Sequence, residues 1–279
     1  MDRPSGAPGA PAPTAPRSSF YLAMRILPTK QREAMYEVYA FCRAVDDIAD
    51  EVGPRSGRIG MLDRWRADIA QLYAGGGPTE LTQALFRPVH TFGLRQEDFL
   101  AILDGIEMDI RRDIRAPNWE ALDLYCDRVA SAVGRLSVRI FGIEEEKGLQ
   151  LAHHLGRALQ MTNILRDLDQ DASLGRLYLP KEALADAEIT EEDIGKVLAH
   201  AALGKACTAV VAKARGHFEQ ASAVMARCSR ESVRSPRIMA FIYRALLDRL
   251  VERGWTAPRA KVRPSKLQFL WVVMRHGVI

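Results

Sequence analysis

The sequence has few residues that could hold a fold together by covalent bonds or bound zinc. Only four of its 279 residues are cysteine, and no two of them have the spacing of a C-x-x-C pair or another zinc site. They lie among apolar residues in helix-like segments, and we interpret them as buried free thiols in a reducing compartment: Cys42, Cys126, Cys207 and Cys228. Because the N-terminus also lacks the apolar core of a signal peptide, we expect a cytoplasmic protein.

Long apolar runs and strong charge clusters are also missing. The longest plainly apolar run near either end, residues 267–274, contains Gln268 and is far shorter than the roughly 20 residues of a spanning helix. The net charge of +4 lacks the clustered basic excess of a nucleic-acid-binding protein, so nucleic acid is excluded as a partner. With 48% hydrophobic and 27% charged residues, the composition is typical of a globular protein with a sizeable core.

The pattern of apolar residues predicts an all-α fold. Residues 1–17 include five Pro, four Ala and two Gly, which predicts a disordered tail. From residue 18 to residue 279, apolar residues recur at spacings of three and four, and no segment alternates strictly as a strand would. We predict one all-α domain (18–279) with helices over 29–51, 56–74, 80–92, 96–114, 119–141, 144–169, 190–228, 236–254 and 266–274, and a loop over 172–180.

Two acidic motifs interrupt these apolar helices. Each is a D-x-x-x-D pair, Asp46 with Asp50 and Asp167 with Asp171. Residues four apart share one face of a helix, where two like charges destabilise each other unless a cation lies between them. Carboxylate oxygens in this arrangement suit Mg²⁺, which keeps several waters and bridges to substrate phosphates.

Further polar residues extend the face that carries each motif. Tyr39 and Arg43 precede the first motif at helical spacing, and Gln160 and Asn163 precede the second. A single acidic pair is more often part of a solvated face than a metal site. Two polar stripes within apolar helices favour the other interpretation, because buried polar groups need partners, and two facing stripes bridged by metal and diphosphate would have them.

With these motifs, the sequence resembles the squalene/phytoene synthase family. The resemblance lies in Ser19 and Phe20, in residues 39–50 (YAFCRAVDDIAD), in residues 160–171 (QMTNILRDLDQD) and in residues 175–180 (GRLYLP). It covers about residues 18–253, nearly all of the predicted domain. It implies an isoprenoid synthase fold of helices around a central cavity, and a prenyltransferase that joins two prenyl diphosphates head to head with Mg²⁺.

Residues 18–28 and 107–134 most resemble the members of the family that make presqualene diphosphate for hopanoid biosynthesis. That resemblance implies two farnesyl diphosphates as substrates, no use of NADPH, and a functional link to downstream hopanoid or squalene enzymes. Three alternatives stay open: a phytoene synthase that uses geranylgeranyl diphosphate, a squalene synthase that uses NADPH, and a non-catalytic assembly or binding member. The absence of a G-x-G-x-x-G fingerprint fits a reaction that ends before reduction, although helical proteins can bind NADPH without it.

The resemblance also implies roles for single residues. The metal ligands would be Asp46, Asp50, Asn163, Asp167 and Asp171. Diphosphate and substrate would be bound by Ser19, Phe20, Arg43, Gln160, Asn163, Arg166 and Arg176. The catalytic residues would be the two arginines Arg43 and Arg166, together with tyrosines that shield or steer cationic intermediates, Tyr39, Tyr125, Tyr178 and Tyr243. For Tyr125 and Tyr243 the alternative is an ordinary half-buried core tyrosine.

Two further features receive separate interpretations. Residues 225–279 hold 12 Lys or Arg and only 3 Asp or Glu. The segment 261–275 combines cationic residues with large apolar ones, which fits an interfacial helix on anionic lipid. The protein would then lie peripherally at the inner face of a membrane. The alternative is a terminal helix that packs on the core. His153 and His154 are adjacent, so they should point to different sides of a helix, and we interpret them as structural or exposed.

Overall fold

The computed structural model describes residues 24–51, 53–111 and 114–262 of the chain. Over these ranges every regular element is a helix, and the sole β-type pairing is an isolated parallel bridge between Arg115 and Leu177. The predicted all-α fold is therefore confirmed. The predicted tail (1–17), the candidate residues Ser19 and Phe20 and the predicted last helix (266–274) lie outside the described residues. None of the helices in the described part is both long and apolar enough to span a membrane.

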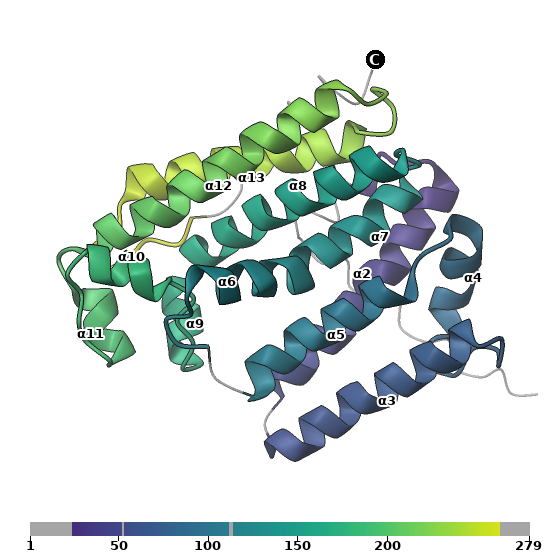
Figure 1. Cartoon of the computed structure of the whole chain (residues 1–279), viewed down its shortest axis with the longest axis horizontal. Coiled ribbons are helices and arrows are strands. Elements are labelled where there is room, and N and C mark those ends of the chain that lie inside the picture. Colours follow the sequence, from purple (N-terminus) through teal and green to yellow (C-terminus); the bar gives the residue numbers. More distant parts are fainter. Residues whose placement is uncertain (1–23, 52, 112–113, 263–279) are drawn as a thin grey trace, which may run out of the picture.

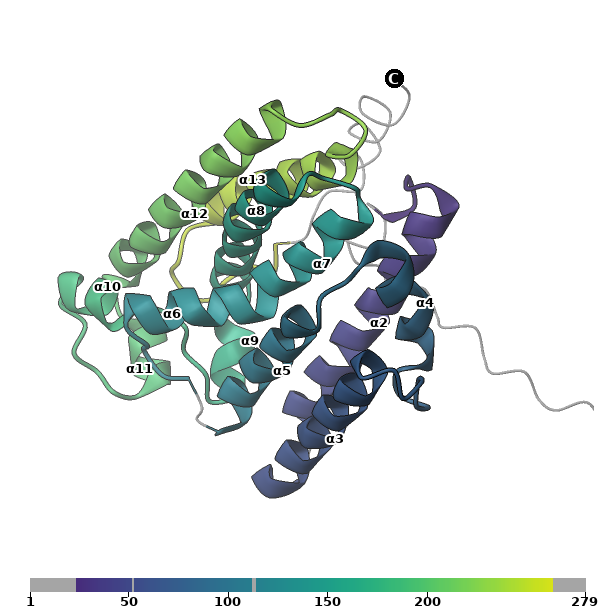
Figure 2. The same cartoon turned by 45° about the vertical axis from the view of Figure 1, so that its right-hand side comes forward.

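The helices form a layered bundle in which α8 is central. Figures 1 and 2 show α8 between α12 on one side and α7 on the other, with α13 also packed against it and with α5, α2 and α3 beyond α7. In chain order they are α2 (Thr29–Asp50), α3 (Arg55–Tyr73), α4 (Gln83–Phe92), α5 (Gln96–Arg111), α6 (Trp119–Cys126), the π-helix η1 (Asp127–Ser131), α7 (Ala132–Ile140), α8 (Glu145–Arg166), α9 (Leu168–Ser173), α10 (Lys181–Asp186), α11 (Ile194–Ala199), α12 (Leu203–Ala226) and α13 (Arg234–Arg253).

Two hydrophobic clusters meet along α7. One is built mainly from α2 to α5, with Phe41 contacting Trp65 and Phe99 edge to face, both at 5.2 Å between ring centroids. The other is built mainly from α6 to α13 and includes the buried side of α8. The α8 backbone also lies close to η1, since a Cβ added at Gly156 would stand 2.7 Å from the backbone of Ser131. Glycine at this position therefore permits the approach.

The structure corrects three of the predicted helices. The predicted helix 144–169 ends at Arg166, and α9 begins at Leu168, so part of the predicted loop 172–180 is helical. The predicted helix 190–228 is two helices, because the backbone becomes extended at His200 between α11 and α12. The first of them begins later than predicted, since Asp193 caps α11 by accepting a hydrogen bond from the Lys196 backbone N–H at 2.9 Å.

The other two differences concern elements that the sequence pattern does not reveal. The predicted helix 119–141 contains the π-helical turn η1, which the three-and-four spacing does not distinguish from α-helix. Helix α10 was not predicted because its six residues follow Pro180 and are too few for an apolar periodicity.

Candidate functional site

The first acidic motif lies on the solvent side of α2. Val45, Ile48 and Ala49 are buried on the opposite side of that helix. The Asp46 and Asp50 side chains remain 53% and 54% exposed. Arg43 donates to Asp46 at 3.0 Å and to its neighbour Asp47 at 2.7 Å. Partial desolvation raises the pKa of Asp46, Arg43 counteracts that, and the Asp50 and Asp47 carboxylates add to it.

The second motif lies across a break between two helices. The predicted single helix face is wrong here, because Asp167 leaves helical geometry between α8 and α9. The two carboxylates stay one turn apart all the same, since the Asp171 N–H donates to the Asp167 carbonyl at 2.8 Å. Burial, the charge of Asp167 and that of Asp109 raise the pKa of Asp171 to about 7, although Arg176 opposes this.

Arg176 contacts both motifs from the loop after α9. Its backbone N–H donates to the Asp171 carbonyl at 2.9 Å, while its guanidinium donates to Asp50 at 3.2 Å and to the Ala49 carbonyl at 3.3 Å. The Arg176 side chain is only 12% exposed. It follows Gly175, whose φ of 76° is open to glycine at no steric cost. This turn places one cation between two sets of carboxylates.

A buried carboxylate that the sequence interpretation missed lies behind the motifs. Asp109 of α5 accepts hydrogen bonds from the hydroxyls of Tyr178 at 2.6 Å and Tyr125 at 3.0 Å. The two tyrosine rings are stacked with centroids 4.9 Å apart. Burial raises the pKa of Asp109, and the two hydroxyls oppose that rise. Asp109 belongs to the 107–134 segment that resembles the family, and it stands four residues before Asp113 in a further D-x-x-x-D pair, a signal that the sequence interpretation did not use.

Arg166 and Tyr243 interact with each other, whereas Tyr39 lies on another helix, α2. Arg166 donates through Nε to Asp167 at 2.8 Å, and the hydrogen bonds and charges of Asp167 and Tyr243 raise its pKa against the effect of burial. Tyr243 is half-buried on α13 and packs beside Leu159. Tyr39 is half-buried on α2 and packs against the N-terminal core cluster.

An oxygen of Asn163 lacks the partner that its burial calls for. Its side-chain nitrogen donates to Gln160 Oε1 at 3.5 Å, but its buried Oδ1 has no hydrogen-bond partner among the residues that the structure describes. A buried acceptor without a partner costs free energy unless a ligand supplies one. Asn163 precedes Asp167 by one helical turn. An amide oxygen and carboxylates are hard oxygen donors of the kind that Mg²⁺ takes, so this donor set fits that cation.

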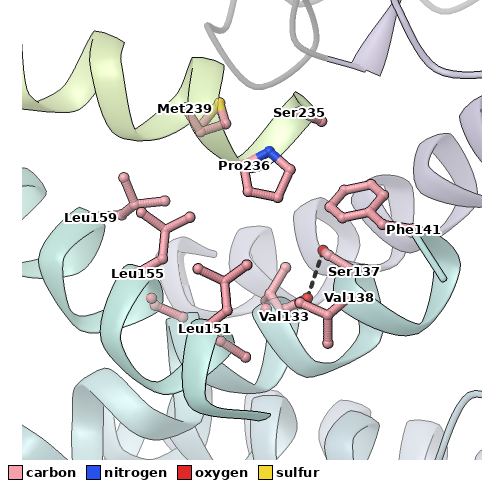
Figure 3. Close-up of a pocket in the computed structure, with 14 residues that line it drawn as sticks. Val133, Ser137, Val138, Phe141, Leu151, Leu155, Leu159, Ser235, Pro236 and Met239 are labelled. Atoms are coloured by element: carbon pink, nitrogen blue, oxygen red, sulfur yellow. Dashed lines mark hydrogen bonds between the residues drawn. The ribbon is translucent and has the colours of Figure 1, made fainter. Parts of the chain in front are cut away.

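An apolar pocket lies along α8 before the polar residues Gln160 and Asn163. It contains about 540 Å³ of empty space, including its open mouth, and lies between α7, α8 and α13. Figure 3 shows Leu155 and Leu159 of α8 directed toward Pro236 and Met239 of α13. Only two of the residues that line it are polar, both serines: Ala130, Val133, Gly134, Ser137, Val138, Phe141, Leu151, Ala152, Leu155, Gly156, Leu159, Ser235, Pro236 and Met239.

The pocket and the metal-binding candidates share one face of α8. Ala152, Gly156, Leu159 and Asn163 follow one another at spacings of four, three and four residues. Such a series forms one stripe along a helix. The stripe is apolar where it lines the pocket and polar where it approaches Asp167. The arrangement can therefore hold an anionic, metal-bound head group at one end and a hydrocarbon chain at the other.

Comparison with known proteins gives a consistent set of relatives. Residues 14–268 match the family model for squalene/phytoene synthase. The chain is 54% identical over 266 residues to a presqualene diphosphate synthase of Sinorhizobium fredii, covering 95% of each protein. It is 53% identical to one of Rhodopseudomonas palustris, covering 98% and 97%. A crystal structure of a squalene synthase from Alicyclobacillus acidocaldarius has a similar fold, with a TM-score of 0.77, 29% identity and coverage of 85% and 89%.

Proposed function

Because the chain belongs to the squalene/phytoene synthase family, we propose that it joins two farnesyl diphosphates head to head into presqualene diphosphate. The observation that carries this proposal is the identity of more than half over nearly the full length with enzymes named for that product. The site geometry supports it, because Arg176 links the two carboxylate motifs and an apolar pocket lies along α8, the helix that ends next to Asp167. Two farnesyl diphosphates give one presqualene diphosphate, one diphosphate and one proton.

We assign Mg²⁺ to the polar end of the site. Asp46 and Asp50 would hold it from α2, and Asp167, Asp171 and Asn163 from the α8–α9 break. The orphan Oδ1 of Asn163 and the raised pKa of Asp171 support this assignment, since both groups would gain from a nearby cation. When bound, the metal stabilises the negative charge that develops on the departing diphosphate.

The arginines of the site bind and orient diphosphate in this proposal. Arg43 and Arg166 now pair with carboxylates of the motifs, and Arg176 with Asp50. With those carboxylates engaged as metal ligands, the guanidinium groups would be available to bind phosphate oxygens, which they match bidentately. Gln160 lies beside Asn163 and completes the polar wall.

The tyrosines and the pocket act on the hydrocarbon part of the substrates. The allylic cation left by the first diphosphate is attacked by the C2–C3 double bond of the second substrate, and loss of a proton closes the cyclopropane. The stacked rings of Tyr125 and Tyr178 offer π faces that attract a cation, and Asp109 fixes their hydroxyls. Tyr39 and Tyr243 would shield the cation from water, and Ser19 and Phe20 would line the cavity.

Product analysis tests the proposal and separates its alternatives. Purified protein is incubated with Mg²⁺ and either farnesyl or geranylgeranyl diphosphate, with and without NADPH, and the products are identified by mass spectrometry. Presqualene diphosphate from farnesyl diphosphate in both cofactor conditions is expected. Squalene formed only with NADPH, or phytoene from the longer substrate, would replace the proposal by the corresponding synthase. Absence of any condensation product would favour the non-catalytic alternative.

The pocket gives a second test, which concerns the site of the prenyl chain. Val133→Phe places a large ring inside the pocket, whereas Leu124→Phe adds the same ring at a position that is 45% exposed. We expect the Val133 variant to raise the KM for farnesyl diphosphate several-fold with its circular dichroism spectrum unchanged, because the ring competes with the chain for space. An equal KM in the two variants would place the prenyl chain elsewhere.

Membrane contact is a separate proposal, which concerns residues outside the described part of the chain. Substrate and product carry long apolar chains, and the segment 261–275 has the composition of an interfacial helix. Attachment there would also bring the product to the downstream enzymes of a hopanoid or squalene pathway. Co-sedimentation with anionic vesicles, before and after removal of residues 261–279, tests it. Equal binding by both forms would exclude this segment as the anchor.

A further inference from the structure

Three histidines from two helices come together beside the middle of α8, away from its C-terminal end at Arg166. His153 and His154 of α8 meet His217 of α12, and one nitrogen from each ring lies within 4.8 Å of the other two. The Nδ1 atoms of His154 and His217 are 3.1 Å apart. This corrects the interpretation of the two adjacent histidines as pointing to different sides, because the ring centroids of His153 and His154 lie 5.9 and 5.3 Å from that of His217 on α12.

We propose that His153, His154 and His217 form a binding site for one borderline transition-metal ion of the Zn²⁺ class. Imidazole nitrogen is the ligand that such ions prefer, whereas Mg²⁺ takes oxygen. Tetrahedral Zn²⁺ with bonds of about 2.0–2.1 Å to nitrogen needs ligand nitrogens roughly 3.3 Å apart. The 3.1 Å pair already meets this need, and side-chain rotation of the exposed His153 brings in the third nitrogen.

The charges around the histidines can accept a cation. Arg157 is buried next to them, but it donates to Asp123 at 2.7 and 2.8 Å and to Asp127 at 3.1 Å. Asp127 is shared with Arg135, which also pairs with Asp98. Arg157 is thus paired with two carboxylates, and these raise the pKa of His153 while Arg157 lowers it. Asp123 and Asp127 therefore offset the repulsion between Arg157 and a cation bound by the imidazoles.

The protonation state of the rings also suits a metal. Burial lowers the pKa of all three histidines, and the neighbouring imidazoles and Arg157 lower that of His217 further, to about 4. The rings are therefore neutral near pH 7, which is the form that binds metal.

The proposed site is independent of the prenyl-diphosphate site. His153 lies 14 residues before Asp167, which directly follows the last residue of α8, and this corresponds to about 20 Å along the helix. The metal would join α8 to α12, and α12 packs on the side of α8 that is opposite α7. Its presence or absence is thus separable from Mg²⁺ at the acidic motifs.

Zinc binding by the full-length protein tests the proposal. Isothermal titration with Zn²⁺, in excess Mg²⁺ to occupy the acidic motifs, should give one ion per chain. We expect His154→Ala and His217→Ala to weaken the affinity at least tenfold, since even outer-shell losses cost about 10–100-fold. His90→Ala, which removes an exposed histidine of α4, is the matched control and should bind as the wild type does.

Two further measurements keep the outcome decisive. His153→Ala removes an exposed ligand without disturbing the core, so its loss of Zn²⁺ binding cannot be ascribed to misfolding. Zn²⁺ should also raise the Tm of the wild type and of His90→Ala but not that of His217→Ala. Zn²⁺ binding that survives in the double variant of His154 and His217, that disappears in Asp167→Asn, or that is absent from the wild type would overturn the proposal.

Discussion

The two acidic motifs have the same sequence pattern but different surroundings. The first lies on an unbroken helix, its carboxylates are about half exposed, and Arg43 pairs with Asp46 and with the adjacent Asp47. The second straddles a helix break, and its Asp167 is only 25% exposed and pairs with Arg166. The pKa of Asp171 is raised to about 7, because burial and the carboxylates of Asp167 and Asp109 disfavour its charge more than Arg176 and Arg166 favour it.

This difference shows which motif depends more on a cation from outside the chain. Solvent and a flexible arginine stabilise the charges of the first motif, at little cost. The second motif holds partly buried charge and an orphan amide oxygen at Asn163, for which the protein supplies no full compensation. We therefore expect that the second motif gains more from Mg²⁺, although catalysis needs both.

The largest expected effect is on turnover. Asp46→Asn and Asp167→Asn should each lower kcat by about 10²-fold or more, because an amide cannot replace a carboxylate as a ligand of a hard cation and charge stabilisation is lost. Steady-state release of diphosphate measures this, and the Tm should change little. Asp248→Asn, at an exposed ion pair with Arg215, is the matched control with expected wild-type turnover.

Near wild-type turnover in either variant would remove that motif from the metal site. If only Asp167→Asn were impaired, the first motif would be an ordinary solvated helix face. The two motifs would then not share a ligand. Equal loss in both would show that the exposed motif takes part despite its weaker need for compensation.

The sequence predicted the main features of the fold but not the surroundings of the motifs. Apolar spacing identified the long helices, since α2 and α8 bury the residues that recur at three and four. The break at Asp167 was not predictable, because the chain carries no glycine or proline there and the i,i+4 hydrogen bond persists across it. Asp109 and His217 were missed for another reason: their partners are distant in sequence, and only tertiary packing brings them together.

The next effect is a pH dependence of stability that belongs to Asp171. Its pKa is about 7 in the folded protein and close to 3.9 in an unfolded chain, so the folded state binds the proton more tightly. The stabilisation is present at low pH and is lost as pH rises from about 4 to 7, by up to ~1.4 kcal/mol per pH unit. Denaturant unfolding of the metal-free protein measures this loss. The comparison is with Asp171→Asn, whose side chain does not titrate.

Other groups titrate over the same range, so the informative quantity is the difference between wild type and variant. The free energy of unfolding of the wild type should fall relative to that of Asp171→Asn as pH rises toward 7. Mg²⁺ should shrink the difference, because a bound cation favours the charged carboxylate. Parallel pH profiles for the two proteins would mean that Asp171 is solvated like the carboxylates of the first motif.

The smallest expected effects concern one carboxylate between the ends of each motif, Asp169 in the second motif and Asp47 in the first. Asp169 pairs through two oxygens with Arg259, whose side chain is 4% exposed and also donates to the carbonyls of Leu198 and Trp255. Asp47 pairs with Arg43, and both are more than half exposed. Removing Asp169 leaves a buried guanidinium without its counter-charge, whereas removing Asp47 breaks a solvated pair.

We therefore expect Asp169→Ala to lower the free energy of unfolding by about 1–3 kcal/mol, less than a fully buried pair because Asp169 itself is 59% exposed. Asp47→Ala should change it by about 0.5 kcal/mol or less. Urea unfolding at pH 7 gives both values with one protocol. Equal effects would contradict the contrast, since the same alanine substitution would then cost the same in an exposed motif and in one anchored by a buried arginine. A larger effect at Asp169 would show that the second motif is held in place by packing before any metal binds.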